Sequence, residues 1–115
     1  MSRDDAQTYC NDLGAELVKI TSAEENDFVL ALARKDAAVR ARVWIGIEWS
    51  SSANGYFWSD FSAPVYTNWG QLHGNENCVV MWTNVSPLYA SGYWNDRPCE
   101  ILPNYLAGIV CKRLP

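Results

Sequence analysis

The chain has 115 residues, of which 49% are hydrophobic and 19% are charged, and its formal net charge is -4. This length suits one domain covering residues 1–115, and the apolar content is enough for a packed core, which argues against intrinsic disorder. A negative surface repels phosphate backbones and anionic lipids, and no apolar run reaches the roughly 18 residues of a membrane span, so neither nucleic acid nor membrane insertion is predicted.

The first part of the chain predicts two helices. Ser2 and Asp5 have the spacing of a capping box, and a helical periodicity follows as far as Gly14, which suits a C-terminal cap. A short strand-like run covers residues 15–20. Ser22 and Glu25 then repeat the capping-box spacing and predict a second helix. The residues that recur at helical spacing in the first helix are Ala6, Tyr9, Cys10 and Leu13, and the inner face predicted for the second is Phe28, Val29, Leu32 and Ala33.

The rest of the chain predicts strands. Apolar residues alternate between positions 43 and 49, which is the pattern of a strand, and Asn54-Gly55 predicts a hairpin turn with a return strand at 56–58. Residues 59–77 show little periodicity, and a segment of that length is usually a functional loop. Further strands are predicted at 78–82, at 93–94 and at 106–112. Helices followed by strands indicate an α+β fold.

The chain contains four cysteines, and no two of them have C-x-x-C spacing, which argues against a zinc ribbon or a thioredoxin-type site. An even number in a short chain predicts two disulfides, for which the sequence allows three pairings. Structural disulfides persist in oxidising compartments, so we expect a secreted or cell-surface extracellular protein. The alternative is four buried free thiols in a cytosolic protein. The cysteines are Cys10, Cys78, Cys99 and Cys111.

Seven short motifs recur along almost the whole chain. They are GAELVKI at 14–20, WIGI at 44–47, WSD at 58–60, NW at 68–69, NCV at 77–79, WND at 94–96 and GIVC at 108–111. Each is common by itself, but in this order they resemble the C-type lectin-like domain. The resemblance implies two helices flanking a mainly antiparallel sheet, with an irregular long-loop region. It also implies disulfides between Cys10 and Cys111 and between Cys78 and Cys99.

One feature departs from the family. Its members usually have a strand before the first helix, and this strand pairs with the last one. Here the helix is predicted from about Ser2, so no residues remain for that strand. The last strand, at 106–112, is therefore expected to have an exposed edge that invites homodimerisation or strand addition. The alternative is that the chain is a mature or recombinant fragment, trimmed at this end, with Met1 as a start codon.

The resemblance also implies a site in the long-loop region. In the family, the W-N-D motif provides two oxygen ligands to Ca²⁺, and a Glu before the loop-closing cysteine provides another. These positions are Asn95, Asp96 and Glu76, and such oxygens are the ligands that Ca²⁺ prefers. Vicinal sugar hydroxyls then complete the calcium shell. The predicted ligand-binding residues are these three together with Gln71, His73 and Asn75.

The long loop departs from the family pattern as well. Lectins of the family have Glu-Pro-Asn or Gln-Pro-Asp in this segment, whereas residues 70–75 read GQLHGN and contain no proline. Asn77 stands where an acid would serve a second calcium site. Two interpretations of Asn95 and Asp96 therefore remain: they are calcium ligands, or they are a polar pair that caps a strand end and satisfies loop backbone.

The predicted function is recognition of an extracellular ligand. The leading hypothesis is carbohydrate binding through a reduced Ca²⁺ site, and the alternative is a Ca²⁺-independent lectin-like domain that binds a protein partner. A structural or ice-contacting variant is a third class that no residue supports. An enzyme is not predicted, because His73 is the only histidine and no paired acids or phosphate-binding loop accompany it. Four aromatic residues could form a sugar platform or belong to the core, Trp69 being the first expected in the core: Trp49, Trp69, Trp82 and Tyr89.

Overall fold

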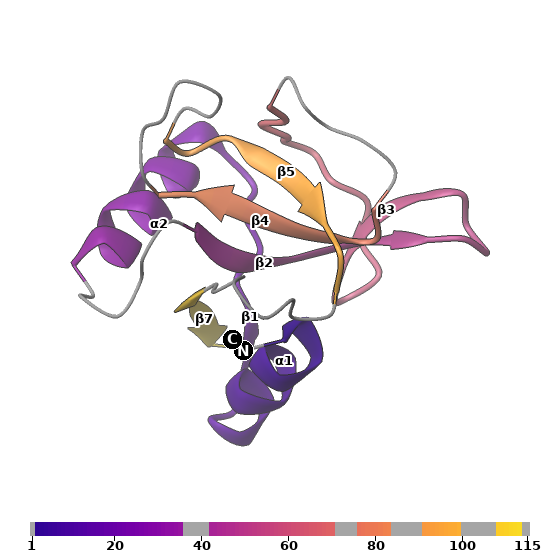
Figure 1. Ribbon diagram of the computed structural model, residues 1–115, viewed down its shortest axis with the longest axis horizontal. Helices are drawn as coiled ribbons and strands as arrows, with labels where there is room; N and C mark the ends of the chain where they lie inside the picture. The colour runs from indigo at the N-terminus through magenta and orange to yellow at the C-terminus, as the bar shows by residue number, and fades with distance from the viewer. Residues whose placement is uncertain (1, 36–41, 71–75, 84–90, 100–107, 114–115) are drawn as a thin grey trace.

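The computed structural model of the chain describes residues 2–35, 42–70, 76–83, 91–99 and 108–113. Figure 1 shows a central sheet with one helix at its side and a second helix below it. The elements, in chain order, are α1 (Arg3–Asp12), β1 (Ala15–Leu17), α2 (Ala23–Arg34), β2 (Arg42–Ser50), β3 (Gly55–Trp58), β4 (Cys78–Trp82), β5 (Trp94–Arg97), β6 (Gly108–Ile109) and β7 (Cys111–Arg113).

Both helices begin at the caps that the sequence predicts. The hydroxyl of Ser2 accepts a hydrogen bond from the backbone N–H of Asp5 at 3.2 Å, and the hydroxyl of Ser22 accepts one from the N–H of Glu25 at 3.1 Å. In the second cap the carboxylate of Glu25 accepts from the N–H of Thr21 at 2.7 Å, one residue before Ser22. Each cap satisfies a backbone donor that the first helical turn leaves unpaired.

The inner face predicted for α2 was partly wrong. Val29 and Ala33 are buried as expected, whereas Phe28 and Leu32 are exposed. In α1 the helically spaced residues divide in the same way, with Ala6 and Cys10 buried and Tyr9 and Leu13 exposed. In α2 the inner face includes Asn26, which is buried because it is hydrogen-bonded to Gly92 and Trp94. An apolar periodicity that ignores a buried asparagine assigns the wrong stripe of the helix to the core.

The sheet is mainly antiparallel, as expected. Its strands lie in the order β3-β2-β4-β5, and β6 pairs with β2 in the parallel sense. A separate two-stranded sheet consists of β1 and β7. The single strand predicted at 106–112 is therefore divided in the part that is described: β6 pairs with β2, β7 pairs with β1, and Val110 lies between them. The carbonyl of Val110 accepts from the N–H of Val18 at 3.0 Å.

The hairpin predicted from Asn54-Gly55 joins β2 to β3. Its pairing ends at Ser50 and Gly55, so the connection consists of the four residues 51–54 rather than two. Asn54 adopts a positive φ of 53°, which asparagine tolerates better than most residues. The alternation along this hairpin sends Glu48 and Phe57 to one face and Trp49 and Tyr56 to the other.

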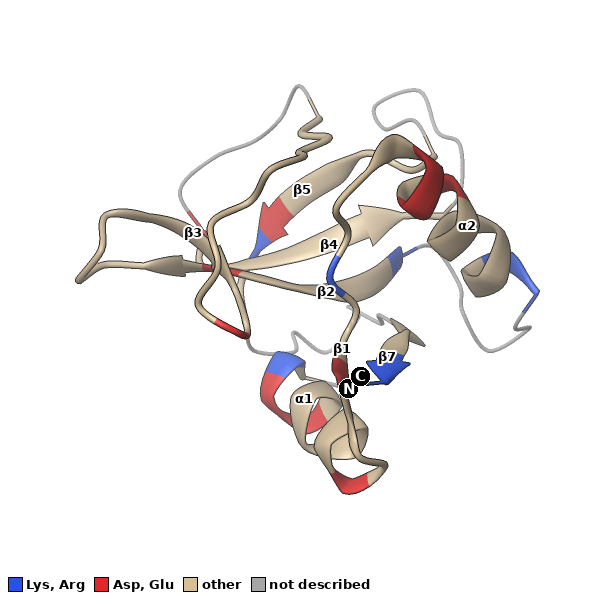
Figure 2. Cartoon of the chain, turned by 180° about the vertical axis from the view of Figure 1, so that it is seen from behind, with Lys and Arg blue, Asp and Glu red and all other residues tan. Residues whose placement is uncertain are grey.

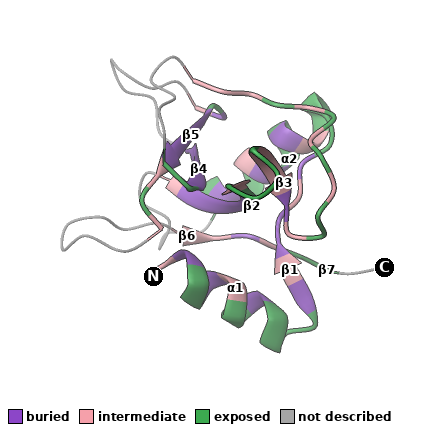
Figure 3. Cartoon of the chain, turned by 90° about the vertical axis from the view of Figure 1, so that its right-hand side faces the viewer, coloured by how far each residue is buried: buried purple, intermediate pink, exposed green. Residues whose placement is uncertain are grey.

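The core has two layers, one on each face of β2 and β4. Val43, Ile45 and Ile47 belong to the layer beneath α2, and Trp44 belongs to the layer beneath α1. Figure 3 shows the buried strands between the two helices, whose outer faces are exposed. At Gly46, in the WIGI motif, a Cβ would lie 2.8 Å from the carbonyl oxygen of Leu17, so β1 can approach β2 this closely only at a glycine.

The two disulfides pair as the resemblance implied. Cys10–Cys111 joins α1 to β7 across a sequence separation of 101 residues, and Cys78–Cys99 spans a separation of 21. By the loop-closure estimate they stabilise the fold by about 4–5 and about 3 kcal/mol, respectively.

The predicted exposed edge of the last strand is consistent with the described pairing, although dimerisation itself stays a prediction. Within the described residues, β7 pairs with β1 on one edge and has no strand partner on the other. None of the described helices has the length and apolar character needed to cross a membrane.

Candidate functional site

The W-N-D motif forms the first three residues of β5, and the strand separates their side chains. Trp94 pairs with Met81 of β4 and Asp96 with Val79, on the face of the α2 core layer. Asn95 pairs with Val80, which belongs to the α1 layer on the opposite face. Because alternate residues of a strand point to opposite faces, Asn95 and Asp96 extend in different directions from adjacent positions.

Trp94 is a structural anchor. Its indole N–H donates to the side-chain oxygen of Asn26 at 2.8 Å, and the Asn26 amide donates to the carbonyl of Gly92 at 3.0 Å. Its ring has edge contacts with Trp58, Tyr66 and Trp69 at centroid distances of 5.7, 5.8 and 5.8 Å. These contacts fix the start of β5 between α2 and the loop residues.

Asn95 is 1% exposed, and its amide is half satisfied. The side-chain oxygen accepts a hydrogen bond from the indole N–H of Trp82 at 2.9 Å, while the Nδ2 group has no hydrogen-bond partner in the described part of the chain. A Cβ at Gly70 would lie 2.5 Å from the Asn95 oxygen, so a glycine there lets the loop backbone approach this amide. The oxygen predicted to bind calcium is therefore already used within the protein.

Asp96 is also 1% exposed, and its carboxylate supports the end of the long loop. One of its oxygens accepts from the backbone N–H of Glu76 at 2.5 Å. The predicted site residues Asp96 and Glu76 are thus brought together, but through the Glu76 backbone rather than through their two carboxylates.

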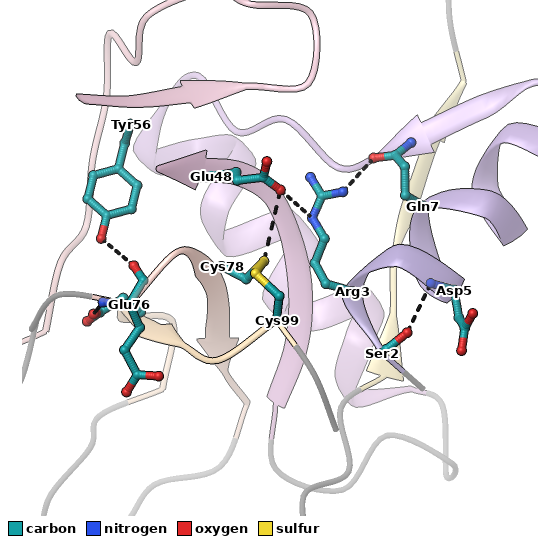
Figure 4. Close-up of a disulfide and its surroundings, with 10 residues drawn as sticks. Ser2, Arg3, Asp5, Gln7, Glu48, Tyr56, Glu76, Cys78 and Cys99 are labelled. Carbon is teal, nitrogen blue, oxygen red and sulfur yellow. Dashed lines mark hydrogen bonds and ion pairs between the residues drawn. A yellow bond between two sulfur atoms is a disulfide. The ribbon is translucent and has the colours of Figure 1, made fainter. Parts of the chain in front are cut away.

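Glu76 lies at the exposed end of this arrangement. The hydroxyl of Tyr56, on β3, donates to the Glu76 carbonyl at 2.9 Å, so the residue is held on both its N–H and its C=O. Figure 4 shows the Glu76 side chain extending away from the Tyr56 ring. Burial raises the pKa of Tyr56, and the nearby Asp96 and Glu76 carboxylates raise it further, so the hydroxyl remains a donor at neutral pH.

The role of Tyr56 was not predicted. The sequence indicated only a return strand at 56–58. Alternation would have placed Tyr56 opposite Trp49, but its contact with Glu76, 20 residues later, depends on how the loop returns to the sheet.

The aromatic residues divide into two groups. Trp49 and Trp69 are half-buried and flank Tyr56, with ring centroids 5.2 and 4.9 Å from it. Trp69 also packs against the core, as expected. Trp82 is 6% exposed and lies between Arg42 and Arg97, whose guanidinium carbons are 5.6 and 4.9 Å from its ring centre, so it is a core residue. Tyr89 lies outside the described residues, as do the predicted ligand contacts Gln71, His73 and Asn75.

Comparison with known families decides the classification. The model of the Lectin C-type domain family matches residues 1–113. The chain belongs to the C-type lectin domain family. Both the disulfide pairing and the position of W-N-D on β5 agree with this assignment.

Relatives of this C-type lectin domain include receptors and lectins. The low affinity immunoglobulin epsilon Fc receptor of Mus musculus is 34% identical over 115 residues, which cover 95% of this chain but only 30% of the receptor. Among solved structures, the SPL-1–GlcNAc complex has a TM-score of 0.78 and 27% identity, covering 96% of this chain and 78% of that one. The Ca²⁺-independent C-type lectin SPL-2 from Saxidomus purpuratus has a TM-score of 0.70 and 26% identity, covering 86% and 71%.

The described residues alone do not fit the calcium ion that the family implies. Ca²⁺ takes about six to eight oxygen ligands, and no group of three His, Cys, Asp or Glu side chains suited to a metal occurs in the described part of this lectin domain. Asn95 faces away from Asp96, and Asp96 is bonded to the Glu76 backbone. The metal-ligand set Glu76, Asn95 and Asp96 stays a prediction.

Proposed function

We propose that this C-type lectin domain binds a glycan at a surface formed by Trp49, Tyr56, Trp69 and Glu76, which we call the Glu76 face. The observation that carries the proposal is the exposed Glu76 carboxylate on a backbone fixed from both sides, by Asp96 and by Tyr56. A carboxylate accepts hydrogen bonds from sugar hydroxyls, and hydrogen bonds to charged groups are the stronger kind. Holding the residue in place before binding reduces the entropy that binding costs.

Aromatic rings add the apolar part of the recognition. Trp49, Tyr56 and Trp69 are half-buried, so each ring keeps exposed edge or face area beside the loop. A glycan longer than one residue can place a hydroxyl against Glu76 and the C–H face of a neighbouring sugar against these rings. Gln71, His73 and Asn75 belong to the same loop and are proposed as additional contacts. The similarity to SPL-1, solved as a GlcNAc complex, supports a sugar ligand.

We further propose that binding does not require a calcium ion shared by Glu76, Asn95 and Asp96. The Asn95 oxygen is bonded to the Trp82 indole, and its side chain lies on the opposite face of β5 from Asp96. The sequence also allowed a second interpretation, in which Asn95 and Asp96 organise the loop backbone instead of binding calcium. The hydrogen bond from the Glu76 N–H to the Asp96 carboxylate supports this interpretation. The likeness to SPL-2, a Ca²⁺-independent lectin by its title, supports this choice.

The test is a glycan array probed with the oxidised domain, followed by titration of the best-bound glycan in millimolar Ca²⁺ and then in excess chelator. Glu76→Gln keeps the size of the side chain and removes its charge, and it should weaken binding about tenfold in both conditions. Glu24→Gln, an exposed change in the first turn of α2, is the matched control and should leave the affinity unchanged.

Each alternative outcome has a distinct meaning. If chelator abolishes binding and Asn95→Ala and Asp96→Ala do the same, the metal-ligand prediction is right and calcium independence is wrong. If the domain binds no glycan in either condition, the glycan proposal fails.

A protein ligand is the second candidate. It is favoured by the 34% identity to the mouse low affinity immunoglobulin epsilon Fc receptor, whose name states a protein ligand. Figure 2 shows the projecting end of the β2–β3 hairpin, where residues 49–58 include no Asp, Glu, Lys or Arg, so a protein partner can cover this end without desolvating ions. If the glycan array shows no binding, the domain should be tested against a panel of extracellular proteins. Saturable binding to one of them would support this candidate.

We also propose an extracellular location, because both disulfides are of the structural kind that persists in oxidising compartments. Homodimerisation through the outer edge of β7 is proposed as well. Sedimentation at increasing concentration tests it, and a strictly monomeric domain would contradict it.

A further inference from the structure

A concave site, separate from the Glu76 face, lies between α1 and the β2–β3 hairpin. It is an open cavity of about 740 Å³, within the size range of small-molecule sites. Glu48 and Phe57, which line it, occupy the hairpin face opposite to Tyr56, so the cavity is on the other side of the hairpin from Tyr56 and Glu76. The residues that define this α1 cavity for the argument below are Arg3, Gln7, Glu48, Phe57, Ser59 and Phe61.

The polar side of the α1 cavity contains a buried arginine that is incompletely paired. Arg3 is 6% exposed, and its Nη1 donates to the Gln7 side-chain oxygen at 3.4 Å. Its Nε has no hydrogen-bond partner among the residues that the structure describes, and the nearest Glu48 oxygen is 3.7 Å away, too far for a direct hydrogen bond. Figure 4 shows the guanidinium between Gln7 and Glu48. Burial lowers the pKa of Arg3, and the Glu48 carboxylate opposes that shift.

A buried donor without a partner is unusual in a folded protein and calls for an explanation. The Gln7 oxygen is shared, because the Ser59 hydroxyl also lies 3.2 Å from it. The rest of the local network is therefore engaged, whereas the buried Nε of Arg3 and the half-exposed Glu48 carboxylate, both from residues that line the cavity, keep unused hydrogen-bonding capacity.

The apolar side of the α1 cavity displays an aromatic ring. Phe61 is 89% exposed and has a φ of 67°, a backbone conformation that bulky residues rarely adopt. The turn around it is firmly bonded: the Phe61 N–H donates to the Trp58 carbonyl at 2.8 Å, and the Asp60 carboxylate accepts from the Ser62 N–H at 3.0 Å. The fold thus holds an exposed ring at the rim of the cavity.

These two sides define the chemistry of a ligand. Arg3 Nε requires an acceptor, and Glu48 requires a donor close by. A single hydroxyl group can do both, by bridging the 3.7 Å gap. An anion would be repelled by Glu48 and by Glu16, which also lines the cavity, and a cation, which only donates, would leave Arg3 Nε without its acceptor. The Phe57 and Phe61 rings suit the C–H face of a sugar ring.

We propose that the α1 cavity binds a neutral saccharide residue, with one hydroxyl bridging Arg3 and Glu48 and the sugar ring against Phe61. This site is independent of the Glu76 face and does not rest on the function proposed there. A sugar and a simple polyol such as glycerol offer the same hydroxyl chemistry, and the experiment below distinguishes between them.

The test is an NMR titration of the ¹⁵N-labelled, oxidised domain with the methyl glycosides of N-acetylglucosamine, mannose and galactose, each against glycerol at the same concentration. The Arg3 Nε–H signal reports on the bridge, and the backbone N–H signals of Gln7 and Phe61 report on the two sides. At least one glycoside should shift all three signals in a saturable manner, and glycerol should not.

Two variants separate this site from the Glu76 face. Phe61→Gly removes the ring and suits the positive φ, so the domain should fold and bind the glycoside about fivefold more weakly at the α1 cavity. Glu76→Gln should leave the Arg3 Nε–H shift unchanged. The proposal is overturned if no glycoside shifts the Arg3 signal, if glycerol shifts it equally, or if Phe61→Gly leaves the affinity unchanged.

Discussion

Two neighbouring regions at the start of β5 each contain a buried asparagine amide, but the two amides differ in how completely they are hydrogen-bonded. In the Trp94 region, formed by Trp94, Asn26 and Gly92, the Asn26 amide accepts from the indole and donates to a carbonyl, so both of its ends are used. One residue further along, the Asn95 amide also accepts from an indole, but its Nδ2 group has no partner among the described residues.

The difference separates the scaffold from the binding surface. Buried polar groups in folded proteins are nearly always hydrogen-bonded, and the Trp94 region follows that rule. Elsewhere the fold leaves some buried polar atoms without a partner among the described residues, including Asn95 Nδ2, Trp58 Nε1 and Arg3 Nε. Of the unused polar groups near β5, the exposed Glu76 carboxylate can bind a ligand without first breaking bonds that hold the domain together.

The largest expected effect concerns the two disulfides. Cys10–Cys111 joins α1 to β7, away from the Glu76 face, so replacing both cysteines with alanine should lower the free energy of unfolding by about 4–5 kcal/mol. The glycan affinity of the molecules that remain folded should not change. Denaturant unfolding and a glycan titration measure the two quantities.

The shorter bridge is the comparison. Cys78 lies two residues after Glu76, so removing Cys78–Cys99 should cost only about 3 kcal/mol but should weaken glycan binding. Equal losses of affinity in the two double variants would contradict the division between scaffold and binding surface.

The next largest effect tests the Trp94 region directly. Asn26→Leu leaves the buried Trp94 indole N–H without an acceptor and the Gly92 carbonyl with Asn68 as its remaining side-chain donor, which should lower the free energy of unfolding by about 3 kcal/mol. Asn68→Ala is the matched control, because Asn68 donates to the same carbonyl at 2.8 Å from a half-buried position and should cost about 1 kcal/mol. Similar losses would mean that the Trp94–Asn26 bond contributes little.

How far the sequence predicts this structure depends on the range of each interaction. The caps at Ser2 and Ser22, the hairpin and the order of elements follow from local patterns, and the structure confirms them. The disulfide pairing came from the family resemblance, because spacing alone left three pairings open. Phe28 and Leu32 were assigned to the core because their apolar character favoured it, whereas the long-range bonds of Asn26 decide which face of α2 is buried.

The site shows the same limit. The family resemblance implied that Glu76, Asn95 and Asp96 lie together, and the structure connects Asp96 to the Glu76 backbone. It could not show that Asn95 faces the Trp82 indole, that Tyr56 holds the Glu76 carbonyl, or that Arg3 is buried, because each depends on the meeting of distant segments. Residues 71–75, which include Gln71, His73 and Asn75, lie outside the described part.

A smaller effect is expected at Tyr56. Tyr56→Phe removes the hydrogen bond to the Glu76 carbonyl, so stability should fall by about 1 kcal/mol or less and glycan affinity about threefold, because Glu76 is no longer held in place. Tyr66→Phe removes a hydroxyl from a ring that packs on Trp94 and should leave the affinity unchanged. If both variants bind equally well, Tyr56 does not organise the Glu76 face.

The smallest effect concerns acid, and it should appear in the scaffold rather than at the binding surface. Burial raises the pKa of Glu25, but hydrogen bonds from Lys112 and from the N–H of Thr21 outweigh it, so the pKa in the folded protein lies below its usual value. A lowered folded pKa contributes stability above the unfolded value of about 4.3, and this contribution is lost as the pH falls through the folded pKa.

Glu25 links the start of α2 to β7, since Lys112 is 2.9 Å from its carboxylate. The Lys112 side chain is 47% exposed and that of Glu25 24%, so solvent screens the pair and we expect the contribution to be about 0.5 kcal/mol. Thermal unfolding measured between about pH 7 and pH 3 should show Glu25→Gln slightly less stable than the wild type at neutral pH and equal to it in acid. Glu24→Gln, in the same helical turn, should run parallel to the wild type throughout. A constant gap between Glu25→Gln and the wild type would mean that the side chain acts through packing and capping geometry, not through its charge.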